Sequence, residues 1–255
     1  MHDRVVTGGS SGRAWWEEYF DEDFLAVYGD LLSPEESAEE ALAAVEALGL
    51  KPPATILDLA CGWGRHSLPL AELGYTVTGL DRSATLLERA HAAARERRLS
   101  PAYVRGDLRA LPFSASFDAV LCFFSSLGYS TDEHDLAALR EVRRVLRPGG
   151  RLLIETMHRD LVAREFVERD WWEGPDGLPV LVEREFDAVA GVSREWLRWK
   201  DVEKYHEIRV RAASEWAGLL EAAGFEPIAW LGGWDLTPFD HTSERLIVVA
   251  APRLQ

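Results

Sequence analysis

Short apolar runs alternate with amphipathic segments over the first 160 residues. The apolar runs have the length of strands, and their nearly continuous hydrophobicity is typical of parallel strands buried on both faces. They lie at residues 55–60, 75–80, 102–105, 117–124 and 152–156. Between them, apolar residues recur three and four positions apart, as Leu136, Leu139 and Val142 do, which indicates helices. This alternation predicts an α/β fold with a doubly wound, mostly parallel sheet.

Helix ends are marked by the usual capping residues. Ser33, followed by Pro34 and by Glu36, predicts the start of a helix that runs to Leu48. Ser83 is predicted to cap a helix that reaches about Arg98. A further helix is expected from Asp132 to Leu146, before a Pro-Gly-Gly turn.

The pattern changes after His158. Residues 180–186, 194–200 and 205–211 are expected to form antiparallel strands, with turns at Gly191 and near Asp201. A helix capped by Ser214 and two strands, near 227–231 and 245–251, follow. We therefore predict an N-terminal tail and helical lid (1–50), a nucleotide-binding core (51–157), inserted antiparallel strands (158–211) and a C-terminal part of the core (212–255).

A glycine-containing turn follows the first apolar run and precedes a helix. The segment from Thr55 to Ser67 contains Gly62 and Gly64, which allow a ligand to approach the backbone closely. A helix N-terminus after such a turn offers free N–H groups to an anion. Asp81 ends the next apolar run, near the interval at which nucleotide-binding βαβ units place a carboxylate for ribose hydroxyls. The pattern predicts a nucleoside site.

Several motifs define the type of site further. Ser67 stands where a dinucleotide fingerprint has Gly or Ala, and no P-loop lysine is present. The run from Leu57 to Gly64 (LDLACGWG) resembles the first motif of the class I S-adenosylmethionine (SAM) methyltransferases. The resemblance continues through Asp81, through Arg105–Leu108 (RGDL) and through Leu146–Leu152 (LRPGGRL). It covers about residues 50–155 well and the C-terminal segment loosely.

The resemblance implies a Rossmann-like methyltransferase fold that ends in an antiparallel hairpin, with SAM as cofactor. It places Gly62 and Gly64 at the methionyl part, Asp81 at the ribose, and Asp107 and Leu108 at the adenine. Arg82, next to Asp81, is also expected to bind the cofactor. Asp58 is expected to bind the methionyl amino group or to orient the glycine turn. Arg65 either meets the methionyl carboxylate or is a solvated residue of the first turn, and Phe123 borders the cofactor at the end of the fourth apolar run.

Aromatic residues are concentrated between Ala14 and Leu32. Trp16, Tyr19, Phe20 and Phe24 share one helical face, which Tyr28 extends. This stripe either packs on the domain or forms a lid over the cofactor, because aromatic faces attract a sulfonium cation. In the second case Tyr19 and Tyr28 are the expected contacts.

Candidates for a general base follow the predicted strands. Tyr129 and His158 come just after the fourth and fifth apolar runs, and His241 lies in the last loop. Each is either catalytic or structural, and His206 is expected to be a core histidine. The tryptophans of the insertion either wall an acceptor pocket or pack in a core; they are Trp171, Trp172, Trp196 and Trp199.

Composition and charge limit the kinds of molecule that the chain is expected to bind. The net charge is −15, and residues 1–50 hold 12 acidic and 2 basic side chains, so the chain is a poor candidate for binding nucleic acid. No apolar run is long enough to span a membrane and no signal-peptide core begins the chain, from which a cytoplasmic location is expected. The two cysteines, Cys61 and Cys122, are expected to be reduced core thiols rather than a disulfide or a metal site.

These observations predict a SAM-dependent methyltransferase that acts on N or O of a small molecule, as a monomer or a homodimer. The inserted strands resemble those of small-amine methyltransferases such as the glycine and sarcosine enzymes. Two alternatives stay open: an NAD-dependent oxidoreductase on the same βαβ arrangement, and a SAM-binding protein without catalysis. A methyltransferase for RNA or protein is disfavoured by the acidic charge.

Overall fold

A seven-stranded sheet forms the centre of the molecule. The computed structural model describes residues 14–253. The strand order is β10-β11-β5-β4-β1-β2-β3, in which β5 to β3 are parallel and β11 and β10 are antiparallel to their neighbours. These strands are β1 (Thr55–Leu59), β2 (Thr76–Asp81), β3 (Ala102–Arg105), β4 (Phe117–Cys122), β5 (Leu146–Thr156), β10 (Phe225–Leu231) and β11 (Leu246–Pro252). The predicted fold class and the C-terminal hairpin are confirmed.

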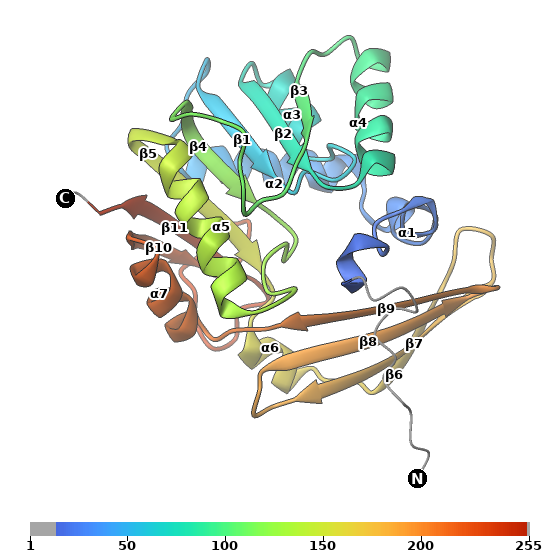
Figure 1. Ribbon diagram of the computed structural model, residues 1–255. Coiled ribbons are helices and arrows are strands. Elements are labelled where there is room, and N and C mark those ends of the chain that lie inside the picture. Colours follow the sequence, from blue (N-terminus) through green and yellow to red (C-terminus); the bar gives the residue numbers. More distant parts are fainter. Residues whose placement is uncertain (1–13, 254–255) are drawn as a thin grey trace.

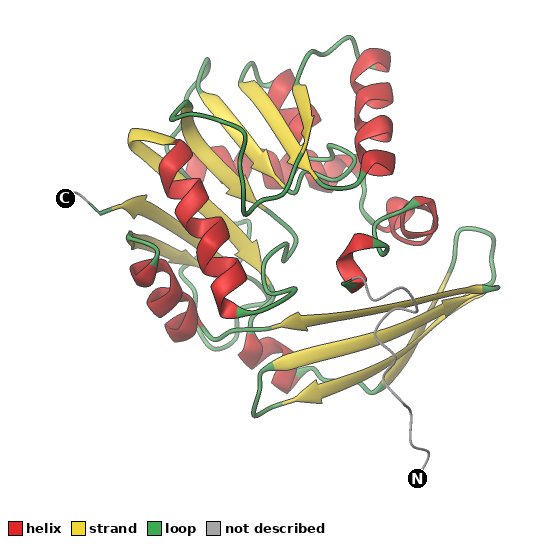
Figure 2. Cartoon of the chain, in the orientation of Figure 1, coloured by secondary structure: helices red, strands yellow, loops and turns green. Residues whose placement is uncertain are grey.

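Helices cover both faces of this sheet (Figures 1 and 2). One apolar cluster joins α2 and α3 to one face through residues such as Leu48, Leu70 and Ile56. Another joins α5 and α7 to the opposite face, where Leu139 and Trp216 are almost fully buried. The helices are α2 (Pro34–Ala47), α3 (Ser67–Glu72), α4 (Ala84–Glu96), α5 (Asp132–Val145) and α7 (Ala213–Ala222).

Capping residues account for most helix starts. Ser33 accepts from the backbone of Glu36, whose carboxylate accepts from Ser33 in return, and Ser83 caps α4 through Leu86 N. The prediction that Ser214 caps α7 is wrong. The cap is Ala212, whose N–H donates to Glu215 at 2.9 Å, so an acidic side chain in the first turn replaces the hydroxyl.

A second, four-stranded antiparallel sheet lies across the carboxyl ends of the parallel strands (Figure 1). Its order is β6-β7-β8-β9, and the connection from the first sheet contains a short helix. These elements are α6 (Arg159–Arg164), β6 (Arg169–Glu173), β7 (Pro179–Asp187), β8 (Val192–Trp199) and β9 (Val202–Arg209). Three of the strands match the predicted ones, whereas α6 and β6 were not predicted because neither has a clear apolar period.

The aromatic segment 14–32 is not one helix, contrary to the expectation. It consists of η1 (Trp15–Glu17), α1 (Glu22–Tyr28) and η2 (Gly29–Leu31). The break has a local cause, because the Asp21 side chain accepts from Phe24 N and starts a new helix. The segment packs between the two sheets (Figure 1). Residues 1–13, which belong to the predicted N-terminal tail, lie outside the described residues.

Candidate functional site

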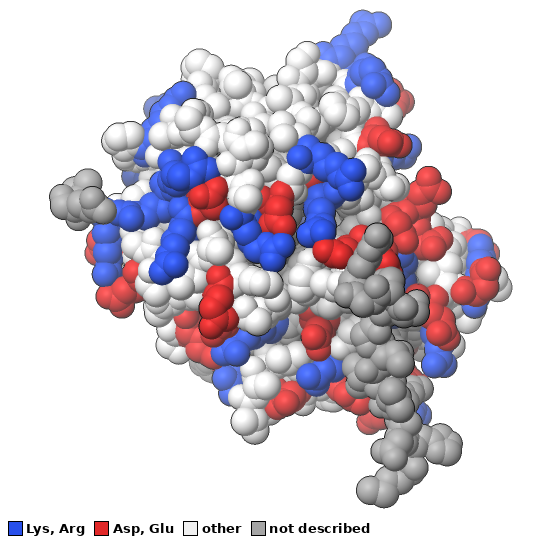
Figure 3. Space-filling view, in the orientation of Figure 1, with Lys and Arg blue, Asp and Glu red and all other residues white. Residues whose placement is uncertain are grey.

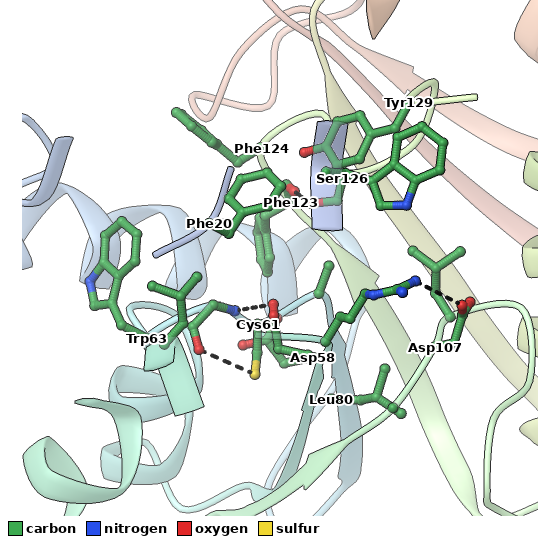
Figure 4. Close-up of a pocket in the computed structure, with 18 of the residues that line it drawn as sticks. Phe20, Asp58, Cys61, Trp63, Leu80, Asp107, Phe123, Phe124, Ser126 and Tyr129 are labelled. Atoms are coloured by element: carbon green, nitrogen blue, oxygen red, sulfur yellow. Dashed lines mark hydrogen bonds and ion pairs between the residues drawn. The ribbon is translucent and has the colours of Figure 1, made fainter. Parts of the chain in front are cut away.

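A cavity opens at the carboxyl ends of β1, β2 and β4, the edge at which open α/β sheets bind ligands (Figure 4). Its floor is the turn after β1 and its sides are the loops after β2, β3 and β4. The N-terminal segment closes it from above. The predicted residues among its lining are Asp58, Gly62, Arg65, Asp81, Arg82, Asp107, Leu108, Phe123 and Tyr129.

The glycine turn is held in place by Asp81. Gly62 has a φ of +54°, and its N–H donates to Asp81 Oδ2 at 2.8 Å. The other oxygen, Oδ1, accepts from Ser83 N at 2.8 Å. Burial raises the pKa of Asp81, while these backbone donors oppose the shift. Each carboxylate oxygen keeps a lone pair for a ligand hydroxyl.

Gly64 has a different function from the one expected. Its φ is +78°, and it does not line the cavity. A Cβ at this position would lie 2.4 Å from the Tyr103 phenol oxygen and 3.3 Å from Ala90 Cβ. The glycine therefore allows the turn to pack against β3 and α4, rather than allowing a ligand to approach.

Asp58 is a buried carboxylate on the floor of the cavity. Ser67 Oγ donates to its Oδ2 at 2.5 Å, which ties the end of β1 to the start of α3. Burial raises the pKa of Asp58 to about 6, against the hydrogen bond from Ser67. This contact supports the expected orientation of the glycine turn.

Asp107 lies beside Asp81 at the same hollow, because β2 and β3 pair with Asp81 opposite Arg105. It is held by two arginines: Arg109 bonds both of its oxygens, and Arg82 Nη1 lies 3.5 Å from Oδ2. The hydrogen bonds from Arg109 lower the pKa of Asp107 to about 2. Arg82 also pairs with Glu17 and so connects this edge to the N-terminal segment.

Arg65 and His66 share one carboxylate. Arg65 Nη1 and His66 Nε2 lie 2.6 and 2.7 Å from Glu40 Oε2, and both side chains line the cavity. The alternative of a solvated Arg65 is wrong, because its side chain is only 10% exposed. Glu40 and His66 were missed by sequence reasoning. The sequence did contain a sign of this pair: Glu40 is an acidic residue among the buried, mostly apolar positions of α2.

Aromatic rings form the upper wall (Figure 4). Trp16, Phe20 and Phe24 come from the N-terminal segment and Tyr129 from the loop after β4. Phe20 stacks on Tyr129 with ring centroids 5.9 Å apart.

Tyr19 and Tyr28 are corrections, because neither lines the cavity. Their hydroxyls lie 3.3 Å apart, and Tyr28 donates to Glu195 while Tyr19 contacts His206 Nδ1 at 3.1 Å. They attach the segment to the second sheet. His206, expected to be a core histidine, has a hydrogen-bond partner in Tyr19 but is only partly buried, with 23% of its side chain exposed.

The candidate bases do not converge on one point. Tyr129 lines the cavity, but burial raises its pKa, which disfavours the phenolate. His158 is fully buried: it caps α6 through Leu161 N, and its Nε2 contacts Ser243 O at 2.9 Å. His241 is exposed outside the cavity. The last two are therefore structural and surface residues, respectively.

The tryptophans of the insertion also lie away from the cavity. Trp171 is 65% exposed, Trp172 packs near Tyr28, Trp196 packs on Tyr205, and Trp199 is buried and donates to Asp176. Both cysteines are buried and free. Within residues 14–253, no three His, Cys, Asp or Glu side chains are placed to hold a metal ion, and no helix is long and apolar enough to cross a membrane.

Charges on the face seen in Figure 3 are mixed. Basic side chains gather over the half that carries α5 and the first sheet, and acidic ones on the side of α1 and the second sheet. Acidic side chains interrupt the basic ones on this face, as expected for a chain with a net charge of −15.

The residues present fit an adenosyl-type cofactor. One hollow is lined by the backbone of Gly62, which has no Cβ, and by the buried carboxylate of Asp81. Leu108 and Phe123 add apolar walls to it. Comparison with known proteins identifies the group. A family of methyltransferase domains matches residues 56–150. A demethylmenaquinone methyltransferase from Beutenbergia cavernae is 41% identical over 113 residues, 44% of each chain.

Solved structures agree over nearly the whole chain. The CcbJ methyltransferase of Streptomyces caelestis has a TM-score of 0.79 at 20% identity, covering 94% of this chain and 99% of that one. SAM-bound CalS10, an amino pentose methyltransferase of Micromonospora echinaspora, has a TM-score of 0.68 at 25% identity, covering 92% and 98%. Residues 56–150 therefore match a methyltransferase domain, and the described chain as a whole has the fold of SAM-dependent methyltransferases.

These comparisons confirm the predicted methyltransferase domain and SAM as its cofactor, and they decide against the nicotinamide-dependent alternative. The alignment with the curated relative spans less than half of that protein's length. Its acceptor is therefore no guide to the acceptor of this chain.

Proposed function

We propose that this methyltransferase transfers a methyl group from SAM to a nitrogen or oxygen atom of a small molecule. The observation that carries the proposal is a single cavity with two unlike halves. Gly62 and Asp81 form a polar cofactor half at the sheet edge, and the aromatic wall above it leaves a confined, apolar acceptor half.

The cofactor half has a defined set of contacts. The hollow is lined here by Gly62, Asp81, Asp107 and Leu108. With SAM bound, Gly62 would lie along the methionyl part, Asp81 would accept from the ribose hydroxyls, and Asp107 with Leu108 would border the adenine. Asp107 is already engaged by Arg109, so its free acceptor capacity toward the adenine amino group is small. SAM supplies a methyl group on a sulfonium, and displacement by an acceptor lone pair releases a neutral thioether. Alignment and exclusion of water therefore provide much of the acceleration.

The acceptor half favours a small substrate. Phe20 and Phe24 cover the hollow, and the N-terminal segment that carries them is fixed to the second sheet by Tyr28 and Glu195. A polymer would have to displace this cover. The similar structure of CalS10, an amino pentose methyltransferase, supports an acceptor of that size.

Calorimetry tests the cofactor assignment. Asp81→Ala should weaken SAM binding by about 1–3 kcal/mol, because ligand hydroxyls lose their partner in a buried site. Asp235→Ala, which removes a carboxylate from an exposed turn outside the cavity, is the matched control and should bind as the wild type does. Unchanged affinity in the Asp81 variant would refute the ribose assignment.

Turnover tests the activity. The purified protein is incubated with SAM and a panel of amines, amino sugars and hydroxyl compounds, and S-adenosylhomocysteine is measured. Formation with one acceptor class supports the proposal. Tight SAM binding without any turnover would indicate a non-catalytic SAM-binding protein, and tighter binding of NAD than of SAM would contradict the proposal.

A further inference from the structure

His66 is held in a fixed orientation at the cavity wall. Its ring stacks on Phe123, with centroids 3.8 Å apart and planes 19° from parallel. The residue is 4% exposed, precedes α3, and lines the same hollow as Phe123 and Tyr129. Stacking on one face and a hydrogen bond at one edge leave the imidazole little freedom to rotate.

Glu40 determines which ring nitrogen carries the proton. Its Oε2 lies 2.7 Å from His66 Nε2 and 2.6 Å from Arg65 Nη1. Burial opposes ionisation of this carboxyl, but the hydrogen bonds from His66 and Arg65 lower its pKa to about 2. An ionised carboxylate only accepts hydrogen bonds, so Nε2 must donate. Nδ1 of the neutral ring is then an unprotonated acceptor.

Nδ1 is the free atom of this arrangement. Within residues 14–253, Nδ1 has no hydrogen-bond partner. The atom is nevertheless not fully enclosed by the protein. The residue lines the cavity beside Phe123, on which its ring stacks. While Nε2 is engaged by Glu40, Nδ1 of this ring is the atom that can accept a hydrogen bond from a molecule in the cavity.

We propose that His66, oriented by Glu40, is a catalytic residue that binds the N–H or O–H of the methyl acceptor through Nδ1 and takes its proton. The inference rests on the proposed function, which it deepens by assigning a proton acceptor. It replaces His158 and His241, which the structure places outside the cavity. As in the Ser-His-Asp triad of hydrolases, a carboxylate orients the histidine and stabilises the imidazolium that forms.

The step is balanced. A lone pair of the acceptor nitrogen or oxygen forms the new bond to the methyl carbon, and the carbon–sulfur bond breaks with its electron pair left on sulfur. The acceptor proton passes to Nδ1, which gives an imidazolium whose Nε2–H still donates to Glu40. The proton leaves to solvent when the product is released.

Burial and the neighbouring arginines keep the His66 ring unprotonated, against the effect of Glu40. Glu40 faces it from α2, Arg65 from the glycine turn, and Arg245 from the loop before β11, 3.8 Å from Glu40 Oε1. Burial lowers the pKa of His66 to about 4, so the ring is neutral over the physiological range. Protonation of His66 should therefore lower the methyltransferase activity only as the pH approaches 4.

Two glutamine variants test the role. His66→Gln keeps an amide donor for Glu40 but removes the acceptor at Nδ1, and His241→Gln makes the same change at an exposed histidine outside the cavity. With an acceptor identified in the turnover panel, His66→Gln should lower kcat about 10²–10⁴-fold, the range for loss of general base catalysis. S-adenosylhomocysteine should bind within about threefold of the wild type, as contact with the cofactor half is not changed. A kcat within threefold of the wild type would overturn the proposal, as would a loss confined to S-adenosylhomocysteine binding. His241→Gln should match the wild type.

A spectroscopic readout does not depend on turnover. In protein with ¹⁵N-labelled histidine, long-range ¹H–¹⁵N spectra with S-adenosylhomocysteine should show His66, assigned by its absence in His66→Gln, as the Nε2–H tautomer at pH 7. A protonated Nδ1 would overturn the proposal. If the wild type turns over no acceptor although the tautomer is as expected, the proposed function fails and the assignment of the proton acceptor fails with it. If the wild type turns over and the His66 variant does too, only the present inference fails.

Discussion

The backbone N–H of Phe124 donates to the carboxylate of Glu155 at 2.7 Å, across the end of β4 and β5. Phe124 and Ser125 both have positive φ values, 57° and 54°, which cost energy for residues with a side chain. Glu155 compensates: its own carbonyl accepts from Ser125 N, and its carboxylate accepts from Arg245. The strained turn directs the Phe124 ring to the cavity rim, 5.3 Å from the Arg65 guanidinium.

Glu155→Ala should therefore destabilise the protein by about 3 kcal/mol, because it leaves the Phe124 N–H without a partner and leaves Arg245 only its longer contact with Glu40. Urea denaturation measures the loss, and SAM binding should weaken with it as the turn relaxes. Glu221→Ala is the control, since its ion pair with Arg253 is exposed and is worth about 0.2–1 kcal/mol. Equal stability losses in the two variants would contradict the assignment.

Gly64→Ala should destabilise the fold rather than block the cofactor. The left-handed φ of +78° costs about 1–2 kcal/mol for a residue with a Cβ. The clash with Tyr103 adds to this, so Tyr103→Phe should recover part of the loss in the double variant. Gly218→Ala in α7, where a Cβ meets nothing within 4 Å, should instead stabilise by about 0.5–1 kcal/mol. Thermal denaturation of the wild type, the three single variants and the double variant measures these effects. If the effects of Gly64→Ala and Tyr103→Phe simply add, the clash is excluded.

Local signals were sufficient to predict the parallel sheet with its helices, and the contact between the glycine turn and Asp81 can be read from the same signals. The capping pair Ser33 and Glu36 marks the start of α2, and the spacing from Gly62 to Asp81 indicates how β1 and β2 end at one edge. These features depend on residues close in sequence or on neighbouring parallel strands. Periodicity and turn chemistry report such relationships directly.

The acceptor half depends on contacts between distant segments, which one sequence does not specify. His158 follows a strand and so was a fair candidate, but its ring turns away to cap α6. Tyr19 shares a helical face with Phe24 only if the segment is one helix, and the cap at Asp21 breaks that face. His66 was passed over because its partner, Glu40, lies 26 residues away on another helix.

Asp58 should make stability depend on pH. Burial raises its pKa to about 6 from 3.8, so the folded protein binds this proton more tightly than the unfolded chain does. The stabilisation is present in full below pH 4 and is lost as the pH rises from about 4 to 6. Asp58→Asn, which keeps an acceptor for Ser67, should gain about 3 kcal/mol relative to the wild type between pH 4 and pH 8. Urea denaturation of both proteins at the two pH values measures this, and a difference that does not change with pH would refute it.

Lys204 should control how firmly the N-terminal segment covers the cavity. Its side chain is 9% exposed, and Nζ donates to Tyr19 O at 3.0 Å and pairs with Asp21, the residue that caps α1. Hydrogen bonds of a charged group contribute about 1.5–3 kcal/mol, so Lys204→Met should increase local opening tenfold or more. Hydrogen exchange of the Phe24 amide, bonded to Asp21, reports the opening, and SAM affinity should fall because Phe20 and Phe24 line the cavity. Lys200→Met removes a more exposed lysine that pairs with Asp176 in the second sheet and should leave both measurements unchanged. Faster exchange with undiminished SAM affinity would show that the segment packs on the domain without acting as a lid.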